Sequence, residues 1–191
     1  MEKIFKELCT GLFKELKHDE LLTLSFCGEN SQFIRLNNAS IRQTGLVDDA
    51  TLGLKFIANK RTCEGSITVS GNHDLDMARG ATEIQRMRSE AKEILEDPFL
   101  VIPTNAGSSC EVKAAASLGF DDAVDALLPV MEGVDLVGIF SNGRMYRGNA
   151  NSKGQHHWFE TESHCLDYSL VTSDHQMVKG TYAGTDWDQD A

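Results

Sequence analysis

The six histidines are the side chains best suited to holding a metal, but their spacing does not form a zinc site. Zinc needs three or four ligands that converge on one tetrahedral point, commonly on a helix as H-E-x-x-H. The chain contains no such motif. His156 and His157 are adjacent and would point to opposite faces of a strand, while His164 and His175 are far apart on strands expected to be neighbours. We therefore predict no metal ligand, no cofactor and no catalytic residue within this chain.

Ser108, Ser109 and Cys110 form the only cluster that suggests nucleophilic catalysis. Such a group needs an orienting base, and no histidine is near it in the sequence. The five cysteines are an odd number, and none forms a C-x-x-C pair. This pattern fits neither a disulfide framework nor a zinc knuckle, so we expect reduced and mostly buried cysteines, Cys110 included. An independent hydrolase based on Cys110 or on a histidine cluster is the least favoured interpretation.

A polar segment around the histidine pair combines hydrogen-bonding groups with an aromatic ring. Such a cluster is suited to contacting a peptide or a protein partner. The alternative is ordinary strand packing with an exposed alternating face. The candidate peptide or interface contacts are Asn149, Asn151, Gln155, His156, His157 and Trp158.

Hydrophobic periodicity predicts helices that would support these residues. Apolar side chains recur every three or four positions over 4–16 and over 74–95, which is the helical period. Asn72 or Asp74 is expected to cap the second helix. A third, short helix should be ended or kinked by Pro129, because proline lacks an N–H donor.

Alternation of apolar and polar residues predicts antiparallel strands in both halves of the chain. Short strands separated by a turn at 28–31 come first, and a hairpin that turns at Asn59 and Lys60 follows. Another hairpin is expected to turn at Asn142 and Gly143, because this dipeptide suits the positive φ angles of a type I′ turn. More strands follow towards the C-terminus.

These elements predict an α+β fold in which antiparallel sheets pack with a few helices, in two halves. We divide the chain into a helix–meander–helix half at 1–100, a connection at 101–118, and a half with one helix and antiparallel strands at 119–191. We also consider a helical turn at 111–117.

The acidic composition restricts the partners of this chain. It has 29 acidic and 18 basic residues and a formal net charge of −11. This charge repels a phosphate backbone, so we expect no nucleic-acid binding. No segment approaches the ~18 apolar residues of a membrane span, and the N-terminus lacks the apolar core of a signal peptide. We expect a cytoplasmic protein with no membrane partner.

Two parts of the sequence carry a resemblance to a known family. They are FIRLNNASIRQTG with TLGLKFI and, more specifically, RGNANSKGQHHWFETESHCLDYSLV with MVKGTYAGTDWD. Together they resemble the N-terminal region of TldD/PmbA proteins, which are also called modulators of DNA gyrase. The positions that match the family pattern are Phe33, Arg35, Arg42, Gln43, Gly53, Leu54 and Ala150 to Gly154.

This resemblance covers residues 20–188 but only part of a family member. The resemblance implies a further C-terminal domain outside this chain, so the strand at 177–184 should lack a covering layer and favour self-association. The resemblance also implies a two-subunit metallopeptidase that admits unfolded peptides to a zinc centre, with this chain forming scaffold, subunit interface and peptide-binding wall. The family's H-E-x-x-x-H zinc motif lies beyond the matched region, so zinc is expected only in a catalytic partner or in a C-terminal region outside this chain.

The partners implied by the resemblance are an unfolded peptide substrate and a TldD-type subunit, in a homo- or hetero-oligomer. The alternative is a self-contained protein-interaction domain with no peptidase role. The resemblance leaves open whether the protein itself acts as an enzyme.

Overall fold

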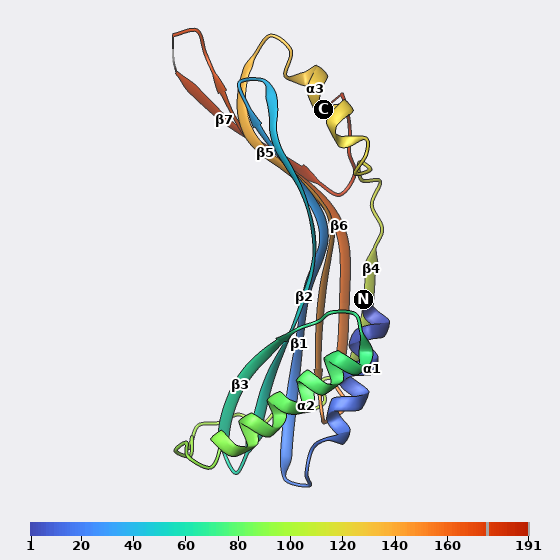
Figure 1. Cartoon of the computed structure of the whole chain (residues 1–191), viewed down its shortest axis with the longest axis vertical. Helices are drawn as coiled ribbons and strands as arrows, with labels where there is room; N and C mark the ends of the chain where they lie inside the picture. Colours follow the sequence, from blue (N-terminus) through green and yellow to red (C-terminus); the bar gives the residue numbers. More distant parts are fainter. Residues whose placement is uncertain (175, 191) are drawn as a thin grey trace. The chain divides into compact units, whose positions relative to one another are not determined.

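The computed structural model describes residues 1–174 and 176–190, in which three helices accompany one seven-stranded sheet (Figure 1). The strand order is β3-β2-β1-β5-β6-β4, and β7 also pairs with β6. The expected α+β fold is confirmed, with a single sheet. His175 lies outside the described residues. The elements are α1 (Glu2–Lys14), β1 (Glu20–Asn37), β2 (Ser40–Ala58), β3 (Arg61–Thr68), α2 (His73–Glu90), β4 (Ser108–Lys113), α3 (Ala123–Val130), β5 (Asp135–Asn151), β6 (His156–Val171) and β7 (Met177–Gly184).

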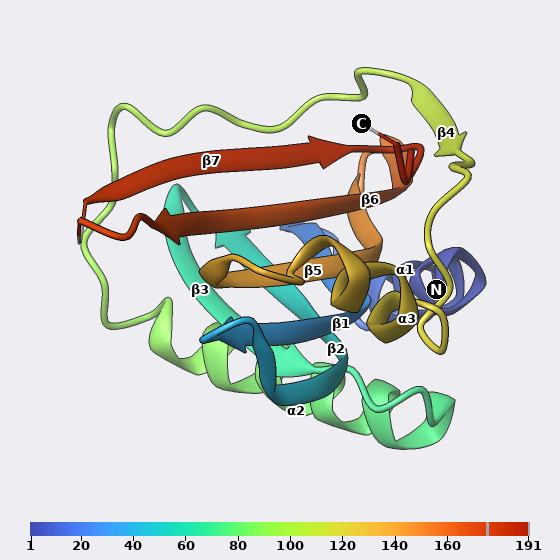
Figure 2. The same cartoon turned by 90° about the horizontal axis from the view of Figure 1, so that it is seen from above.

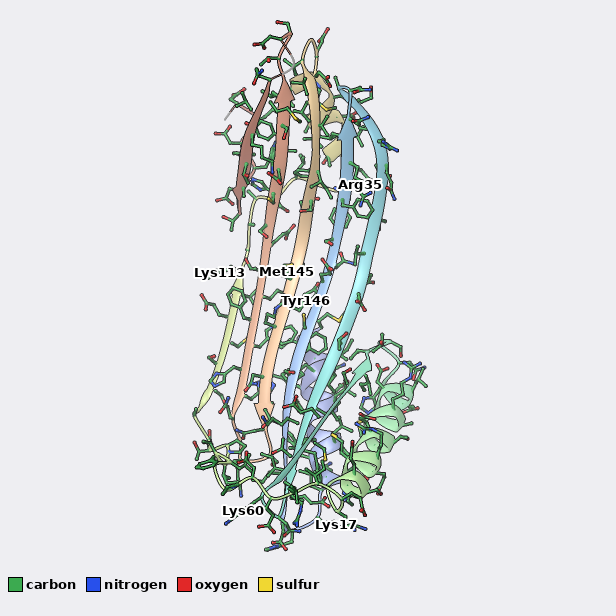
Figure 3. The ribbon with its side chains drawn as sticks, turned by 90° about the vertical axis from the view of Figure 1, so that its left-hand side faces the viewer. Lys17, Arg35, Lys60, Lys113, Met145 and Tyr146 are labelled. Carbon is green, nitrogen blue, oxygen red and sulfur yellow. The ribbon has the colours of Figure 1, made fainter. Side chains whose placement is uncertain are left out.

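The chain divides into two compact units, and the four longest strands contribute residues to both. Met145 and Tyr146, which follow each other on β5 (Figure 3), are the last residue of a unit 2 segment and the first of a unit 1 segment. Each unit draws on residues from both sides of the connection expected at 101–118. Unit 1 comprises Met1–Gly28, Asp49–Glu111 and Tyr146–Phe159, and unit 2 comprises Glu29–Asp48, Val112–Met145 and Glu160–Ala191.

Unit 1 is built around side chains from α1, α2 and the sheet. Phe5 of α1 is fully buried, and its ring centroid lies 5.5 Å from that of Phe26 and 5.8 Å from that of Trp158. The predicted helical stripe places Leu8 and Leu12 in the same core. The other buried members are Cys9, Leu22, Leu24, Ala50, Leu52, Leu54, Phe56, Cys63, Ile67, Val69, Ile84, Met87, Ala91, Tyr146 and Ala150.

Helix α2 begins where the sequence predicts and is tied to β1 by an ion pair. Asn72 Oδ1 accepts a hydrogen bond from the backbone N of Leu75 at 3.1 Å, which caps the helix. Arg88 donates from two nitrogens to the Glu20 carboxylate at 2.6 and 2.7 Å, and the two side chains are only 11% and 8% exposed. Such a bidentate pair fixes both position and orientation. The helix ends at Glu90, earlier than predicted.

The turn between β2 and β3 is the one predicted. Asn59 and Lys60 have φ angles of 49° and 59°, and the register pairs Ala58 with Arg61. Lys60 lies at the tip of this hairpin (Figure 3). Two consecutive positive φ angles are the mark of a type I′ turn, whose twist matches that of the strands.

The turn predicted at 28–31 is wrong, because β1 runs through these residues without a break. Gly28 allows the backbone of Asp49 to approach β1 closely, since a Cβ at position 28 would lie 2.9 Å from the carbonyl oxygen of Asp49. The chain turns instead at Asn38 and Ala39, with φ angles of 50° and 51°. Asparagine enters this left-handed region more readily than most residues.

Unit 2 has its own core, in which α3 packs against the sheet. Ala123 and Leu127 of this helix are fully buried. Pro129 is the next-to-last helical residue, so the predicted end of the helix is confirmed. No helix in the described part of the chain is long and apolar enough to cross a membrane. The other buried members of this core are Ile34, Leu36, Met131, Leu136, Phe140 and Leu166.

The hairpin predicted at Asn142 and Gly143 is also wrong, because both residues lie inside β5. Asn142 is buried, and its Nδ2 donates to the carbonyl oxygen of Leu118 at 2.6 Å. Gly143 has a φ of 144°, and a Cβ there would lie 2.3 Å from the carbonyl oxygen of Asn30. A dipeptide typical of turns therefore allows two strand segments to approach each other.

The connection between the predicted halves contains a strand where we considered a helical turn at 111–117. Strand β4 pairs with β6, and all six of its residues are exposed. Strand β7 pairs with another part of β6, from His164 to Val171 (Figure 2). In β7, Val178 is 58% exposed, whereas Tyr182 packs against the core of unit 2.

Gly143→Ala is expected to destabilise unit 2, because the added methyl group would overlap backbone atoms of Asn30 and Ser31. The free energy of unfolding, measured by chemical denaturation, should fall by about 2 kcal/mol or more. Gly107→Ala is the matched control: Gly107 also has a positive φ, of 91°, but its added Cβ meets no atom within 4 Å. The control should lose about 1 kcal/mol. Equal losses would contradict the close-approach explanation.

Candidate functional site

Asn151 is the centre of a hydrogen-bond network in the turn between β5 and β6. Its side chain is buried, and its Oδ1 accepts from the backbone N of Lys153 at 2.9 Å and of Gln155 at 3.3 Å. Its Nδ2 donates to the carbonyl oxygen of Thr104 at 2.9 Å. Gln155 Nε2 donates in turn to Oδ1 of Asn149 at 2.7 Å. The structure thus brings three predicted contact residues together, and their polar groups hold the turn itself.

Trp158 and His156 pack towards the core of unit 1. Trp158 is 1% exposed, and its ring lies 5.5 Å from that of Phe26 and 6.1 Å from that of Tyr146. Trp158 is therefore a core residue instead of an accessible contact. The His156 ring lies 5.2 Å from that of Phe5, and burial lowers the pKa of His156. This histidine is mainly neutral at pH 7.

His157 contacts the edge strand β4. Its Nδ1 lies 2.8 Å from Oγ of Ser109, a residue 48 positions away. Nothing in the sequence indicates this pair, because only the pairing of β4 with β6 brings the two together. A serine and a histidine are two parts of a nucleophilic arrangement, but no carboxylate in the described ranges hydrogen-bonds to His157. His157 and Ser109 instead form a polar contact at the sheet edge.

Cys110 on β4 is exposed, which corrects the expectation of a buried thiol. Its Sγ lies 3.4 Å from Oε1 of Glu2. Cys9 and Cys63 are buried, and burial raises the pKa of both, that of Cys9 to about 12. Because Cys27 is also exposed and Cys165 is only partly buried, the expectation of mostly buried cysteines is wrong.

The described side chains show no arrangement that fits a zinc ion. Within residues 1–174 and 176–190, no three histidine, cysteine or carboxylate side chains lie close enough to hold a metal. His156 packs on a phenylalanine, His157 contacts a serine, and His164 lies between aromatic rings in unit 2.

Unit 2 contains an apolar pocket that sequence patterns did not reveal. Its volume is about 260 Å³. Helix α3 supplies Leu127 and Val130, and the C-terminal segment, which returns alongside α3 in Figure 1, supplies Trp187, Asp188 and Gln189. The pocket is assembled from segments far apart in the sequence, so no local spacing marks it. The remaining walls are Val134, Leu136, Leu166, Tyr168, Leu170 and Tyr182.

His164 is buried against two aromatic residues of this pocket. It is 3% exposed, and its ring lies 5.1 Å from that of Tyr182 and 5.2 Å from that of Trp187. Neither ring nitrogen has a hydrogen-bond partner among the described residues. Burial lowers the pKa of His164, although the nearby Asp186 carboxylate acts in the opposite direction. The imidazole is therefore held mainly in its neutral form at pH 7.

Several solved structures share this fold. One is TldE from Thermococcus kodakarensis, which is 13% identical to this chain and gives a TM-score of 0.71. The match covers 96% of this chain and 43% of the TldE chain. A protein named as a modulator of DNA gyrase from Thermotoga maritima matches 94% with 42% of its length, at 14% identity and a TM-score of 0.65. Another from Bacteroides thetaiotaomicron matches 97% with 45% of its length, at 16% identity and a TM-score of 0.61.

These matches confirm the resemblance seen in the sequence at the level of the fold. This chain spans less than half the length of each of the three proteins. No protein-family model and no curated protein matches the sequence.

Asn151→Ala should lower the free energy of unfolding by about 1–3 kcal/mol, because it leaves several partly buried polar groups without partners. Urea denaturation measures this loss. The matched control is Asn149→Ala, which removes a single acceptor for Gln155 and should cost less than about 1 kcal/mol. A smaller loss for Asn151→Ala than for the control would show that Asn151 does not organise the turn.

Protonation of His164 should weaken the fold at mildly acidic pH. Because the folded-state pKa is lowered, the unfolded chain takes up the proton first, near the ordinary value of 6.5. Stability is thus fully present above this pH and decreases as the pH falls, by up to about 1.4 kcal/mol per unit for this group. His164→Phe should reduce the slope measured by denaturation between about pH 6.5 and 5. An unchanged slope in His164→Phe would refute this prediction.

Proposed function

We propose that this chain is the non-catalytic N-terminal portion of a TldD/PmbA-type metallopeptidase protein. The observation that carries this proposal is the fold shared with TldE over 96% of the chain. The sequence resemblance over residues 20–188 supports it independently. The match covers only 43% of TldE. The peptidase activity of a longer protein or of a complex is therefore also part of what we propose.

The role of the chain in this proposal is to form scaffold, subunit interface and part of a peptide-binding wall. The sheet offers edges for this purpose. Strand β3 pairs only with Thr51–Ala58 of β2. Within the described part of unit 2, residues 40–48 of β2 therefore form an outer edge of the sheet with no further strand paired to it. An extended peptide can add to such an edge through backbone hydrogen bonds. The exposed strand β4 is a second edge, and its unit 1 part carries Ser109 against His157.

Zinc belongs, in this proposal, to a TldD-type partner or to a region outside this chain. The described histidines do not converge, so we assign no step of hydrolysis to them. His157 is the best placed of the six contact residues to touch a peptide, because it is not part of the Asn151 network and its partner Ser109 is exposed. Asn151 and Trp158 would act indirectly, by holding the turn and the strand that carry His157.

A self-contained protein-interaction domain is the second candidate function. The exposed apolar residues of β7 favour it, since Met177 is 62% and Val178 is 58% exposed. Clustered apolar surface of this kind marks interaction sites. This function would require no zinc-bearing subunit.

The purified chain should not cleave an unfolded casein-type substrate on its own, but should form a complex with a TldD-type subunit that cleaves it. Size-exclusion chromatography with light scattering measures assembly, peptide release measures activity, and zinc analysis should place the metal in the partner. Cleavage by the isolated, repurified chain would contradict the proposal. Binding of the subunit without effect on cleavage would favour the interaction domain.

Within such a complex, His157→Ala should raise KM a few-fold and leave kcat nearly unchanged, because it removes a contact made equally to bound substrate and transition state. The matched control is His73→Ala, which changes an exposed histidine of the same unit outside the candidate patch. The same change in KM for both variants would show that His157 does not contact the bound peptide.

A further inference from the structure

The walls of the unit 2 pocket are held in place by hydrogen bonds of their own. Trp187 Nε1 donates to Gln189 Oε1 at 3.0 Å, and Gln189 Nε2 donates to the carbonyl oxygen of Ala126 in α3 at 3.0 Å. The Tyr182 hydroxyl donates to the carbonyl oxygen of Asp188 at 3.2 Å and accepts from its backbone N at 3.1 Å. The C-terminal segment is thereby tied both to β7 and to α3. A pocket fixed in this way loses little conformational entropy when it is filled.

The size and lining of the pocket select one large apolar side chain. Nine of its eleven lining residues are aliphatic or aromatic. Its volume of about 260 Å³ is below the ~300–1,000 Å³ of sites for drug-sized ligands. It exceeds the ~150 Å³ of a cavity that holds benzene. The rim is apolar too, since Val130 is 49% and Val134 is 40% exposed, so filling the pocket would remove apolar surface from water.

Most of the negative charge of the chain belongs to unit 2, the unit that contains this pocket. Unit 2 has 14 acidic and 5 basic residues, a formal charge of −9, whereas unit 1 has 15 and 13, a charge of −2. Asp188 lines the pocket, and the exposed residues Asp125 and Glu132 are each two positions in the sequence from a lining residue, Leu127 and Val130. No lysine or arginine is found among the described lining residues. The surroundings therefore attract cations and repel anions.

We infer that this pocket docks a peptide segment in which a bulky apolar side chain is flanked by lysine or arginine residues. The apolar side chain fills the pocket, and the basic residues face the acidic rim. A second copy of this chain is disfavoured as occupant, because it would bring a further −9 charge from unit 2 to the same place. The inference rests on the pocket and the charge of unit 2, and it does not depend on the proposed relationship to metallopeptidases.

The test measures binding of a short fluorescent peptide, with one phenylalanine between pairs of lysines, to the whole chain by fluorescence anisotropy. Val130→Lys places a charge at the rim of the pocket, and Leu128→Lys is its matched control. Both residues are on α3 and are similarly exposed, at 49% and 44%, but only Val130 lines the pocket. Lysine is compatible with the C-terminal end of a helix, so both variants should fold, which circular dichroism checks.

Val130→Lys should weaken binding about tenfold or more, whereas Leu128→Lys should change it by no more than about twofold. Replacing the phenylalanine by serine, or the lysines by glutamates, should also weaken binding, and added salt should weaken it through screening. Equal effects of the two variants, or equal binding of the serine peptide, would overturn the inference. It would equally be overturned if the peptide did not bind and Val130→Lys abolished self-association of the chain, because the occupant would then be a second copy.

Discussion

The structure depends on the pairing of four long strands, whose side chains alternate between the two faces of the sheet. Neighbouring residues of a strand point in opposite directions, so the core residues of one strand should share one parity of position. Strand β1 meets this constraint with even-numbered residues in both cores: Leu22, Leu24 and Phe26 in unit 1, and Ile34 and Leu36 in unit 2. A single inserted residue between these groups would turn one of them away from its core.

Local features of the fold could be predicted wherever nearby residues determine them. The apolar stripe of α1, the Asn72 cap of α2 and the turn at Asn59 and Lys60 depend on spacing and turn chemistry within a few positions. Gly28 and Gly143 misled prediction for a physical reason. Glycine permits a turn, but it equally permits another segment to approach its backbone closely, and the second use depends on a strand distant in the sequence.

The candidate site shows the same limit. Asn149, Asn151 and Gln155 could be grouped from the sequence because they belong to one turn, yet the burial of Asn151 and Trp158 depends on partners such as Thr104 and Phe26. The contact of Ser109 with His157 and the pocket of unit 2 were not predictable, since residues from separate segments create both. Composition did indicate a strongly acidic chain, but only the fold shows that unit 2 carries most of this charge.

The interleaving of the two units has a consequence for how the chain is made. Each unit consists of three separate segments, and the core of unit 1 joins Phe5 near the start of the chain to Trp158. During synthesis from the N-terminus, the apolar face of α1 therefore cannot complete its core contacts until most of the chain has left the ribosome. Pairing over such separations is slow, because a long loop must close before its contacts form. Recombination between genes can exchange this architecture intact only as a whole, because every internal crossover divides at least one unit and every crossover between residues 29 and 159 divides both.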